Sequence, residues 1–499
     1  MSSDNNMQQY STMKLKTEYN AWKIPKSLHN LLKDYDGKVI TRFPPEPSGI
    51  LHIGHIKAIF INYVIAKKYN GKMILRFDNT NPVTESLDYE IAIQEDITKL
   101  GIIPDTVTYS SDYFQKLINY AEKLVYDGKA YVDTTQKDIM KEQRRNCISS
   151  ANRDNSIQHN VELWDQMKQG LLPNSCLRLK MNMSHSNANC RDPTIFRYVD
   201  QPHHRTGEQF KVYPSYDFAC PIIDSLEGIT HAFRSVEYQD REEQYSFILD
   251  ILNLRKPIVL CYGKVKFKDI VLSKRKIKAL IQKGVISNWD DPRLFTLRGL
   301  FNRGLHLDAL KQFVATLGFS NKTPPIMSTE KLLTINRKLI DKIATRYMCL
   351  SNDNLQQYKI LGDLPIDNHI DKFTKNKDLG TRKIDYSHNI LINEIFQPNE
   401  EITLMFMGNA IVSENNNLQL NLDGDYKNTK HKVIWIPKEN PVKVKILKYN
   451  GYEPPIITSY LGESQLINVK KGEYIQLLKM NYYMCVDVSD ICITLVELD

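Results

Sequence analysis

The first part of the chain carries short apolar runs on either side of an amphipathic segment. Residues 38–45 (KVITRFPP) form an apolar run that two prolines end, which predicts a buried strand. Residues 55–69 place apolar side chains such as Ile56 and Ile59 on one face at helical spacing. Residues 72–78 (KMILRFD) repeat the strand pattern. The segment therefore predicts a βαβ unit, in which two parallel strands are joined by a right-handed crossover. The next residues, 81–101, begin with Asn-Pro and end at Gly101, which predicts a helix.

The pattern changes character further along the chain. Mixed helix and strand patterns in the middle predict an α/β module inserted into the sheet, and a helical stretch follows it. Beyond about residue 350 the apolar period becomes two, which predicts antiparallel strands in one or two small β-barrels. The predicted parts are an N-terminal extension, a Rossmann-type doubly wound α/β domain in two halves, the inserted module, a helical connective domain and the C-terminal β-barrels: residues 1–36, 37–103 with 213–280, 104–212, 281–350 and 351–499.

Composition narrows the class of protein. With 42% hydrophobic and 25% charged residues, the 499-residue chain has the make-up of an ordinary globular protein. No apolar stretch reaches the roughly 18 residues of a membrane span, and the N-terminal residues lack the apolar core of a signal peptide. Eight cysteines without CxxC spacing favour reduced thiols over a zinc ribbon. We therefore expect a cytoplasmic protein with no membrane partner. Its net charge of +8 permits a polyanionic partner without demonstrating one.

A candidate phosphate site lies where the first strand passes into the helix. The segment LHIGH (residues 51–55) has a glycine that allows close backbone approach, and it stands at a helix N-terminus, where unpaired N–H groups bind anions. His52 and His55 could donate hydrogen bonds to phosphoryl oxygens and stabilise charge that develops there. The alternative is a pair of surface or capping histidines, to which an isolated motif of this kind gives equal weight.

A second candidate is a basic segment about 220 residues later. Residues 264–278 carry seven basic side chains and one acid, and they include VLSKRK at residues 271–276. Lys274 is a compact point charge suited to a triphosphate. Taken alone, the segment fits a solvated basic face or an RNA-backbone patch as well.

Together and in this order, the two segments resemble the signature motifs of class I aminoacyl-tRNA synthetases. Further segments are similar to the glutamyl/glutaminyl subgroup of archaeal and eukaryotic type: TRFPPEPSGILHIGH, LRFDNTNP, CRDPTIFRY, the stretch from HHRTGEQF to DREEQY, WDDPR and the C-terminal VKKGEYIQLLKMNYYMCVD. The resemblance covers about residues 36–499. It implies an enzyme that activates an amino acid with ATP and transfers it to the 3′ end of a tRNA. The inserted module would hold the acceptor end, and the β-barrels would hold the anticodon.

The resemblance also implies roles for single residues. For the amino acid it implies Arg42, Phe43, Pro44, Glu46, Asp78 (for the α-ammonium), Tyr216 and Arg234. For ATP it implies His52, His55, Glu237, Leu272, Ser273 and Lys274, with Mg²⁺ on the phosphates and no metal held by the protein. His52, His55 and Lys274 would act by positioning and charge stabilisation, because the carboxylate of the amino acid is itself the nucleophile.

Arg234 bears on the choice between glutamate and glutamine. Glutamyl enzymes of the family carry arginine at this position, whereas glutaminyl enzymes usually carry an uncharged residue. An arginine can bind a carboxylate through two hydrogen bonds, and a buried unpaired charge would disfavour a neutral amide. We therefore expect ligation of L-glutamate to tRNA(Glu). The alternatives are a glutaminyl-tRNA synthetase of the same fold, in which Arg234 binds tRNA or a structural acid, and a non-catalytic RNA-binding paralogue.

The sequence departs from the family pattern just before the basic segment. Lys264-Val265-Lys266 stands where relatives usually have Arg-Leu-Asn, and lysine does not replace a stacked or bidentate arginine. The contacts of Lys264 and Val265 with ATP therefore stay open. Near the C-terminus, Tyr482 and Tyr483 are candidates for stacking on RNA bases, with alternating core residues as the stronger interpretation.

Overall fold

The computed structural model describes residues 22–322 and 326–498, and the chain forms two compact units. The first unit contains the described residues up to Lys274 together with those of Val314–Met327, and the second contains Arg275–Phe313 with the described remainder of the chain. Residues 1–21 of the expected N-terminal extension lie outside the described residues. The rest of that extension includes α2 (Lys26–Leu32) and Trp22, whose ring stacks near Phe60.

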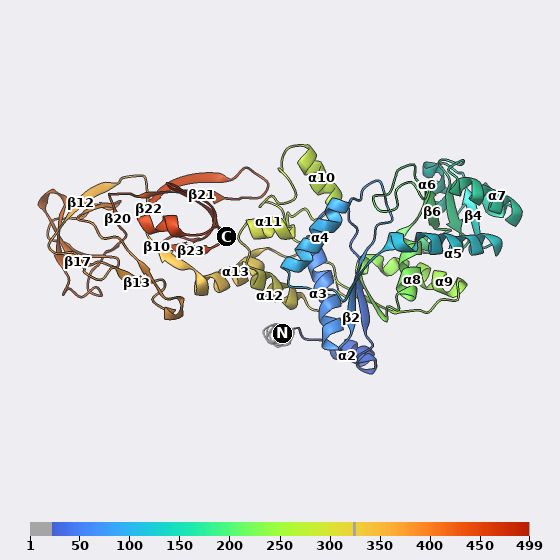
Figure 1. Ribbon diagram of the computed structural model, residues 1–499, viewed down its shortest axis with the longest axis horizontal. Coiled ribbons are helices and arrows are strands. Elements are labelled where there is room, and N and C mark those ends of the chain that lie inside the picture. The colour runs from blue at the N-terminus through green and yellow to red at the C-terminus, as the bar shows by residue number, and fades with distance from the viewer. Residues whose placement is uncertain (1–21, 323–325, 499) are drawn as a thin grey trace, which may run out of the picture. The chain divides into compact units, whose positions relative to one another are not determined.

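A parallel sheet forms the centre of the first unit (Figure 1). The strands pair in the orders β1-β2-β3 and β8-β9, and β8 continues the sheet beside β1, because the N–H of Thr230 donates to the carbonyl of Ile40 at 3.0 Å. The strands are β1 (Ile40–Phe43), β2 (Lys72–Phe77), β3 (Thr106–Tyr109), β8 (His231–Ser235) and β9 (Ile258–Tyr262). The helices that connect them are α3 (Ile53–Lys68), α4 (Leu87–Lys99), α8 (Tyr216–Leu226) and α9 (Glu242–Ile251). The strand order reverses beside β1, so the predicted doubly wound fold is confirmed.

The helix expected from Asn81 onward begins six residues later, at Leu87. The backbone N–H of Asn81 donates to the Glu85 carboxylate at 2.9 Å, and the N–H of Ser86 donates to the carbonyl of Pro47 at 3.2 Å. These bonds hold the segment against the loop that follows β1, so it forms a turn beside the sheet edge instead of a first helical turn.

The inserted module is an antiparallel sheet in the order β4-β5-β6-β7, with helices against it. Its elements are β4 (Ala130–Asp133), β5 (Cys176–Leu179), β6 (Thr194–Tyr198), β7 (Val212–Pro214), α5 (Phe114–Tyr126), α6 (Lys137–Arg145) and α7 (Ile157–Lys168). Its core is not closed on itself. Trp164 and Phe196 belong to the same buried cluster as Phe218 of α8 and Ile248 of α9.

The second unit begins with helical segments and the turns between them. The helices are α10 (Lys274–Gln282), α11 (Leu297–Asn302), α12 (Leu307–Leu317, whose last residues belong to the first unit) and α13 (Glu330–Ile343). The residues before α11 are a turn rather than the expected helix, because the Asp291 carboxylate accepts hydrogen bonds from the backbone N–H groups of Ser287 and Arg293. No helix among the described residues is both long enough and apolar enough to cross a membrane.

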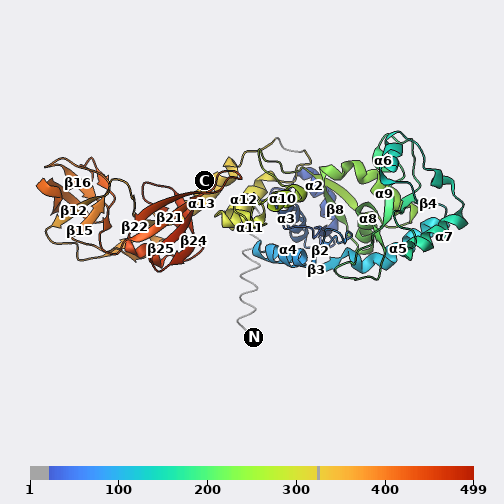
Figure 2. The same ribbon diagram turned by 90° about the horizontal axis from the view of Figure 1, so that it is seen from above.

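Two seven-stranded sheets follow, with the orders β10-β23-β24-β25-β21-β22-β11 and β19-β16-β17-β18-β12-β15-β20 (Figure 2). A separate hairpin joins β13 to β14. The strands are β10 (Thr345–Tyr347), β11 (Cys349–Ser351), β12 (Gln356–Leu361), β13 (His369–Asp371), β14 (Thr381–Lys383), β15 (Asn389–Ile392), β16 (Glu401–Leu404), β17 (Gly408–Ser413), β18 (Asn417–Asn421), β19 (Lys432–Val433), β20 (Ile436–Pro437), β21 (Val442–Lys448), β22 (Ile456–Gly462), β23 (Tyr474–Leu477), β24 (Tyr482–Ser489) and β25 (Cys492–Glu497).

Each of these barrel-like sheets encloses a core of its own. Trp435 belongs to one core and Tyr483 to the other. Most strand pairs are antiparallel, as expected, but four are parallel: β10 with β23, β21 with β25, β12 with β18 and β16 with β19. Tyr483 is a core residue, and the hydroxyl of Tyr482 donates to the Asp341 carboxylate at 2.6 Å, so the structure favours a packing role for both tyrosines.

Candidate active site

A cavity of about 700 Å³ lies at the carboxyl ends of β1, β2 and β8, where a doubly wound sheet binds its ligands. Its walls combine the loop after β1, the start of α3, the start of α8 and the basic segment before α10. All thirteen residues singled out from the sequence line it: Arg42, Phe43, Pro44, Glu46, His52, His55, Asp78, Tyr216, Arg234, Glu237, Leu272, Ser273 and Lys274. Residues as far apart in sequence as Arg42 and Lys274, 232 positions, are thus brought to one site.

The two histidines of the HIGH segment stack on each other with ring centroids 3.7 Å apart. His52 caps α3, because its Nδ1 accepts from the N–H of Gly54 at 3.1 Å, and Nδ1 of His55 accepts from the N–H of His52 at 3.2 Å. Burial, reinforced by the charge of Lys274, lowers the pKa of His52 to about 3, and burial with the neighbouring His52 holds the pKa of His55 well below its usual value. Both rings are therefore neutral with the proton on Nε2, which makes each a hydrogen-bond donor in the cavity.

Lys274 reaches across from the start of α10 to the loop after β1. Its Nζ donates to the carbonyl of Glu46 at 2.6 Å and to the hydroxyl of Ser48 at 3.3 Å. The ammonium group is thereby brought to the same end of the cavity as the histidine pair. Lys264 forms a 2.6 Å ion pair with Glu237, and both side chains are exposed.

The opposite end of the cavity rests on a buried ion network. Asp224 of α8 is fully buried and accepts from Nε of Arg42 at 3.0 Å, from Nη2 of Arg76 at 2.5 Å and from the hydroxyl of Tyr245 at 2.9 Å. Arg76 also pairs with Glu227 at 2.7 Å. Burial alone would raise the pKa of Asp224, but the two arginines outweigh it and lower that pKa to about 2, so the carboxylate stays ionised.

Arg234 lies beside this network without an acid of its own. The side chain is 4% exposed, and its Nε and Nη1 have no hydrogen-bond partner among the described residues. Its guanidinium lies 5.0 Å from the ring of Tyr238 and 5.1 Å from the ring of Tyr245. Arg42 and Arg76 thus pair with Asp224 and Glu227, whereas Arg234 forms no ion pair with an acid among the described residues. Burial raises the pKa values of the nearby Tyr216 and Cys220, so neither supplies the missing negative charge.

Carboxyl groups gather on another wall of the cavity. Burial raises the pKa of Asp78 to about 7, with Arg76 acting against this and Glu46 adding to it. Burial also raises the pKa of Glu85 to about 9. Near neutral pH Asp78 can therefore supply a negative charge for a cation, whereas Glu85 is protonated.

Sequence reasoning missed several lining residues. Lys57 of α3 is buried and donates to the carbonyl of Gly263 at 2.7 Å. A lysine within the apolar run of that helix could have indicated a buried polar contact from the sequence alone. Arg197 enters the cavity from β6 of the inserted module, and Tyr238 comes from the turn after β8. No local pattern marks these two, because only the fold brings them to the site.

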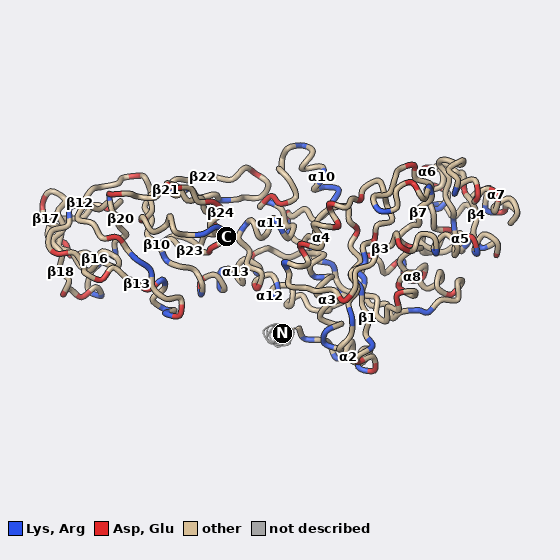
Figure 3. Tube along the Cα trace, viewed as in Figure 1, with Lys and Arg blue, Asp and Glu red and all other residues tan. Residues whose placement is uncertain are grey.

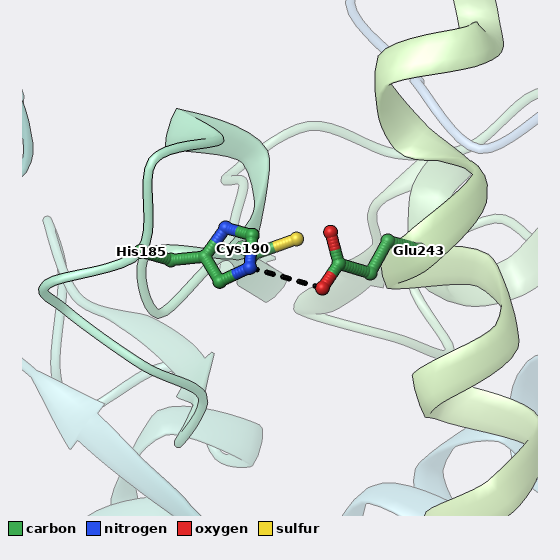
Figure 4. A group of neighbouring side chains, drawn as sticks. All are labelled: His185, Cys190 and Glu243. Carbon is green, nitrogen blue, oxygen red and sulfur yellow. Dashed lines mark ion pairs between the residues drawn. The ribbon is translucent and has the colours of Figure 1, made fainter.

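A separate group of metal-ligating side chain types lies where the module meets α9. Among the described residues it is the one group of at least three His, Cys, Asp or Glu side chains within reach of a single ion: His185, Cys190 and Glu243 (Figure 4). Nδ1 of His185 accepts from the N–H of Asn187 at 3.0 Å, so the ring carries its proton on Nε2, which lies 3.0 Å from the Glu243 carboxylate. Both ring nitrogens of His185 and the Glu243 carboxylate therefore already take part in hydrogen bonds.

Comparison with known proteins gives consistent matches. The family model of the catalytic domain of tRNA synthetases class I (E and Q) matches residues 38–342. A protein of Encephalitozoon cuniculi, named as a probable cytoplasmic glutamate–tRNA ligase, is 40% identical over 476 residues, covering 90% of this chain and 74% of its own. The cytoplasmic glutamate–tRNA ligase of Saccharomyces cerevisiae is 39% identical over 481 residues, covering 90% and 68%.

A solved structure is also similar. It is a glutamate tRNA ligase from Elizabethkingia meningosepticum in complex with its amino acid, 17% identical, with a TM-score of 0.42 over 62% of this chain and 70% of that one.

Proposed function

Because the chain belongs to the class I tRNA synthetases for glutamate and glutamine, it is an ATP-using aminoacyl-tRNA ligase, and we propose that it joins L-glutamate to tRNA(Glu). The named relatives at about 40% identity are glutamate–tRNA ligases, which supports the choice of amino acid. Their names also support a cytoplasmic location.

The single observation that carries this proposal is the uncompensated arginine. A buried cation without a counter-ion is costly, and a ligand carboxylate would supply both the missing charge and two hydrogen bonds to the guanidinium. Nε and Nη1 of Arg234 are buried atoms without a hydrogen-bond partner among the described residues, and the Arg234 side chain lines the cavity. Glutamine would bring an amide whose NH₂ group faces these N–H donors. The charge balance of the site therefore favours an acidic side chain over its amide.

The other end of the amino acid would lie toward Asp78 after β2. Its carboxylate suits an α-ammonium group, and its raised pKa makes this interaction weaken in mild acid. Arg42, Phe43, Pro44, Glu46 and Tyr216 complete this half of the site in the proposal.

In the proposed first step, an oxygen of the glutamate α-carboxylate attacks the α-phosphorus of ATP. A new O–P bond forms, the bond to the β-phosphate oxygen breaks, and pyrophosphate leaves. His52 and His55 would donate from Nε2–H to phosphoryl oxygens, and Lys274 would add a positive charge as pyrophosphate departs. In the second step, a 3′-terminal ribose hydroxyl of the tRNA attacks the carbonyl carbon of the adenylate, and AMP leaves.

The ATP end of the site would also use Glu237, Leu272 and Ser273. Mg²⁺ would enter on the phosphates of ATP, where it neutralises their charge. The side chains proposed for the phosphates offer nitrogen donors, which bind phosphate oxygens rather than Mg²⁺, so the donor set fits a metal carried by the nucleotide.

For tRNA binding, we assign the acceptor end to the inserted module and the anticodon to the C-terminal sheets. Arg197 of the module at the cavity wall supports the first assignment. In the second unit, a pocket lined by Lys372, Gln465 and Tyr474, among others, supports the second, since cationic, amide and aromatic side chains suit an RNA loop with unstacked bases. Basic residues are frequent in the β13–β14 region (Lys372, Lys375, Lys377, Arg382 and Lys383), and Figure 3 shows blue segments of the trace beside β13.

The test is aminoacylation of total tRNA by the full chain with labelled glutamate and labelled glutamine in parallel. Charging with glutamate alone is the expected result. Charging with glutamine would identify the glutaminyl alternative, and tRNA binding without charging by either amino acid would identify a non-catalytic paralogue.

A further inference from the structure

We propose that Asp224 is a positioning residue that determines specificity. It holds Arg42 at the arginine-lined end of the amino-acid pocket, and it leaves Arg234 as the one cation there without an anionic partner among the described residues. The inference rests on the proposed function, because it assigns the γ-carboxylate of glutamate to this end of the cavity. It concerns a residue that does not reach the substrate, since Asp224 is fully buried and is not part of the cavity wall.

The geometry fixes the Arg42 guanidinium from two sides. Its Nε lies 3.0 and 3.1 Å from the two carboxylate oxygens of Asp224, and its Nη1 donates to the carbonyl of Phe233 at 2.8 Å. Phe233 directly precedes Arg234 in β8, so the same arginine also ties down the strand that carries the unpaired guanidinium. Nη2 of Arg42 lacks these partners, and its one hydrogen-bond contact among the described residues is the weak acceptor Sγ of Cys220 at 3.9 Å.

Tyr245 joins Asp224 to Arg234 through its two ends. Its hydroxyl donates to Asp224 at 2.9 Å, and its ring lies 5.1 Å from the Arg234 guanidinium. The carboxylate thus contacts Arg42 directly and reaches Arg234 through one side chain. Its position controls both arginines that line the pocket.

Asp224 also sets the charge at this end of the pocket. Asp224 is shared by Arg42 and Arg76, whereas Glu227 contacts Arg76 and not Arg42. Without the Asp224 carboxylate, Arg42 would have no anionic partner among the described residues and would keep the hydrogen bond to the carbonyl of Phe233. Its guanidinium would then be held from one side instead of two, and it would lose the fixed position that matches a single carboxylate.

The experiment compares Asp224→Asn with Glu227→Gln in the full chain at saturating tRNA. Both substitutions neutralise a buried carboxylate that pairs with Arg76, so Glu227→Gln is the matched control for general loss of an ion pair. For each variant we would measure KM for glutamate, KM for ATP and the inhibition constant of L-glutamine, which fills the same pocket without a charge.

For Asp224→Asn we expect KM for glutamate to rise at least 30-fold, while KM for ATP and the glutamine inhibition constant stay within threefold of the wild type. For Glu227→Gln we expect all three values within fivefold. Equal weakening of glutamate and glutamine, or the same loss in both variants, would mean that Asp224 only supports the fold, and the proposal would fail. An unchanged KM for glutamate would overturn it too.

Tyr245→Phe keeps the ring and removes only the hydrogen bond to Asp224, so it decides the matter if Asp224→Asn does not fold. A threefold to tenfold rise in KM for glutamate, with the glutamine inhibition constant unchanged, supports the proposal, and no change contradicts it. The wild-type charging assay separates these results from the proposed function. Charging of glutamate by the wild type upholds the function whatever the variants show.

Discussion

The two ends of the cavity are built in different ways. At the amino-acid end, Arg42 and Asp224 are almost fully buried and have fixed hydrogen-bond partners. At the ATP end, Lys264 and Glu237 form a largely exposed pair, and Lys274 extends from the start of a helix to a loop. A buried network can discriminate between two ligands that differ by one group, because every unsatisfied polar atom there is costly. Exposed lysines suit a ligand whose charge shifts during the reaction, since their long side chains can move toward the atoms on which the charge develops.

The largest effect is expected when Arg234, the unpaired cation at the amino-acid end, is removed. We expect Arg234→Cys to lower kcat/KM for glutamate, because a charge-assisted pair is lost in a dry pocket. The loss should correspond to about 2–5 kcal/mol of activation free energy. Arg241→Ala is the control, since Arg241 lies near the same Tyr238 ring but is partly exposed and pairs with Asp217. Competition kinetics with glutamate and glutamine is the measurement. Glutamate charging within about twofold of the wild type would remove the main physical support for glutamate, because a lost buried pair costs far more.

At the other end, Lys274→Ala should lower kcat for adenylate formation by ~10²-fold with little change in stability, because one donor to developing charge is worth about 3 kcal/mol. Lys276→Ala, an exposed lysine in the same helix, is the control and should keep the wild-type rate. Pre-steady-state release of pyrophosphate distinguishes the two. Equal rates in all three proteins would assign the basic segment to RNA alone.

Asp78 gives the amino-acid end a pH dependence that the ATP end lacks. We expect kcat/KM for glutamate to rise with pH up to an apparent pKa near 7, because only the carboxylate binds the ammonium group. KM for ATP should stay nearly constant over the same range, since His52 and His55 remain neutral. A flat glutamate profile between pH 6 and pH 8, taken as about one unit either side of that pKa, would show that Asp78 does not hold the substrate.

The same group makes a prediction about stability. Asp78 keeps its proton to a higher pH in the folded state than in the unfolded state, so the protein loses this proton when it unfolds. Raising the pH therefore favours unfolding and lowers the free energy of unfolding. Asp78→Asn removes this loss. Urea unfolding should therefore show the variant gaining stability relative to the wild type as the pH rises from about 5 to about 8. A constant difference across that range would argue against the raised pKa.

The smallest effect is expected at the exposed pair. Lys264→Ala should change kcat/KM for ATP by no more than about fivefold, because exposed ion pairs are worth ~0–1 kcal/mol. Lys264→Arg restores the residue that relatives usually carry, and it should match or exceed the wild type. A loss as large as that of Lys274→Ala would mean that Lys264 also acts on the phosphates, and the contrast between the two ends would need revision.

The sequence predicted the residues that line the cavity better than it predicted how they are held. The HIGH segment and the basic segment could be found because each is a local pattern that keeps its chemistry at fixed spacing. The network beneath them was missed, although its signals were present. Arg42 is the one charged residue of β1, and Arg76 and Asp224 each lie among apolar residues in β2 and α8. Their pairing spans about 150 to 180 residues, so only the fold could reveal it.

The fold shows the same division. The period-two pattern predicted strands in the C-terminal region, but it carries no information on which strands become neighbours. The parallel pairing of β21 with β25 therefore had no local signature. The late start of α4 at Leu87 has a similar cause, because a hydrogen bond from Ser86 to Pro47 outweighs the helical pattern.

The shared core between the inserted module and helices α8 and α9 bears on how this protein can be engineered. The buried cluster that contains Trp164 and Phe196 is completed by Phe218 and Ile248, which come later in the chain. A module cut out at its two sequence boundaries would carry an apolar face with nothing to cover it, and the remaining protein would expose the other half. Chimaeras that exchange this module between relatives should therefore succeed only when the facing surfaces of α8 and α9 are exchanged with it.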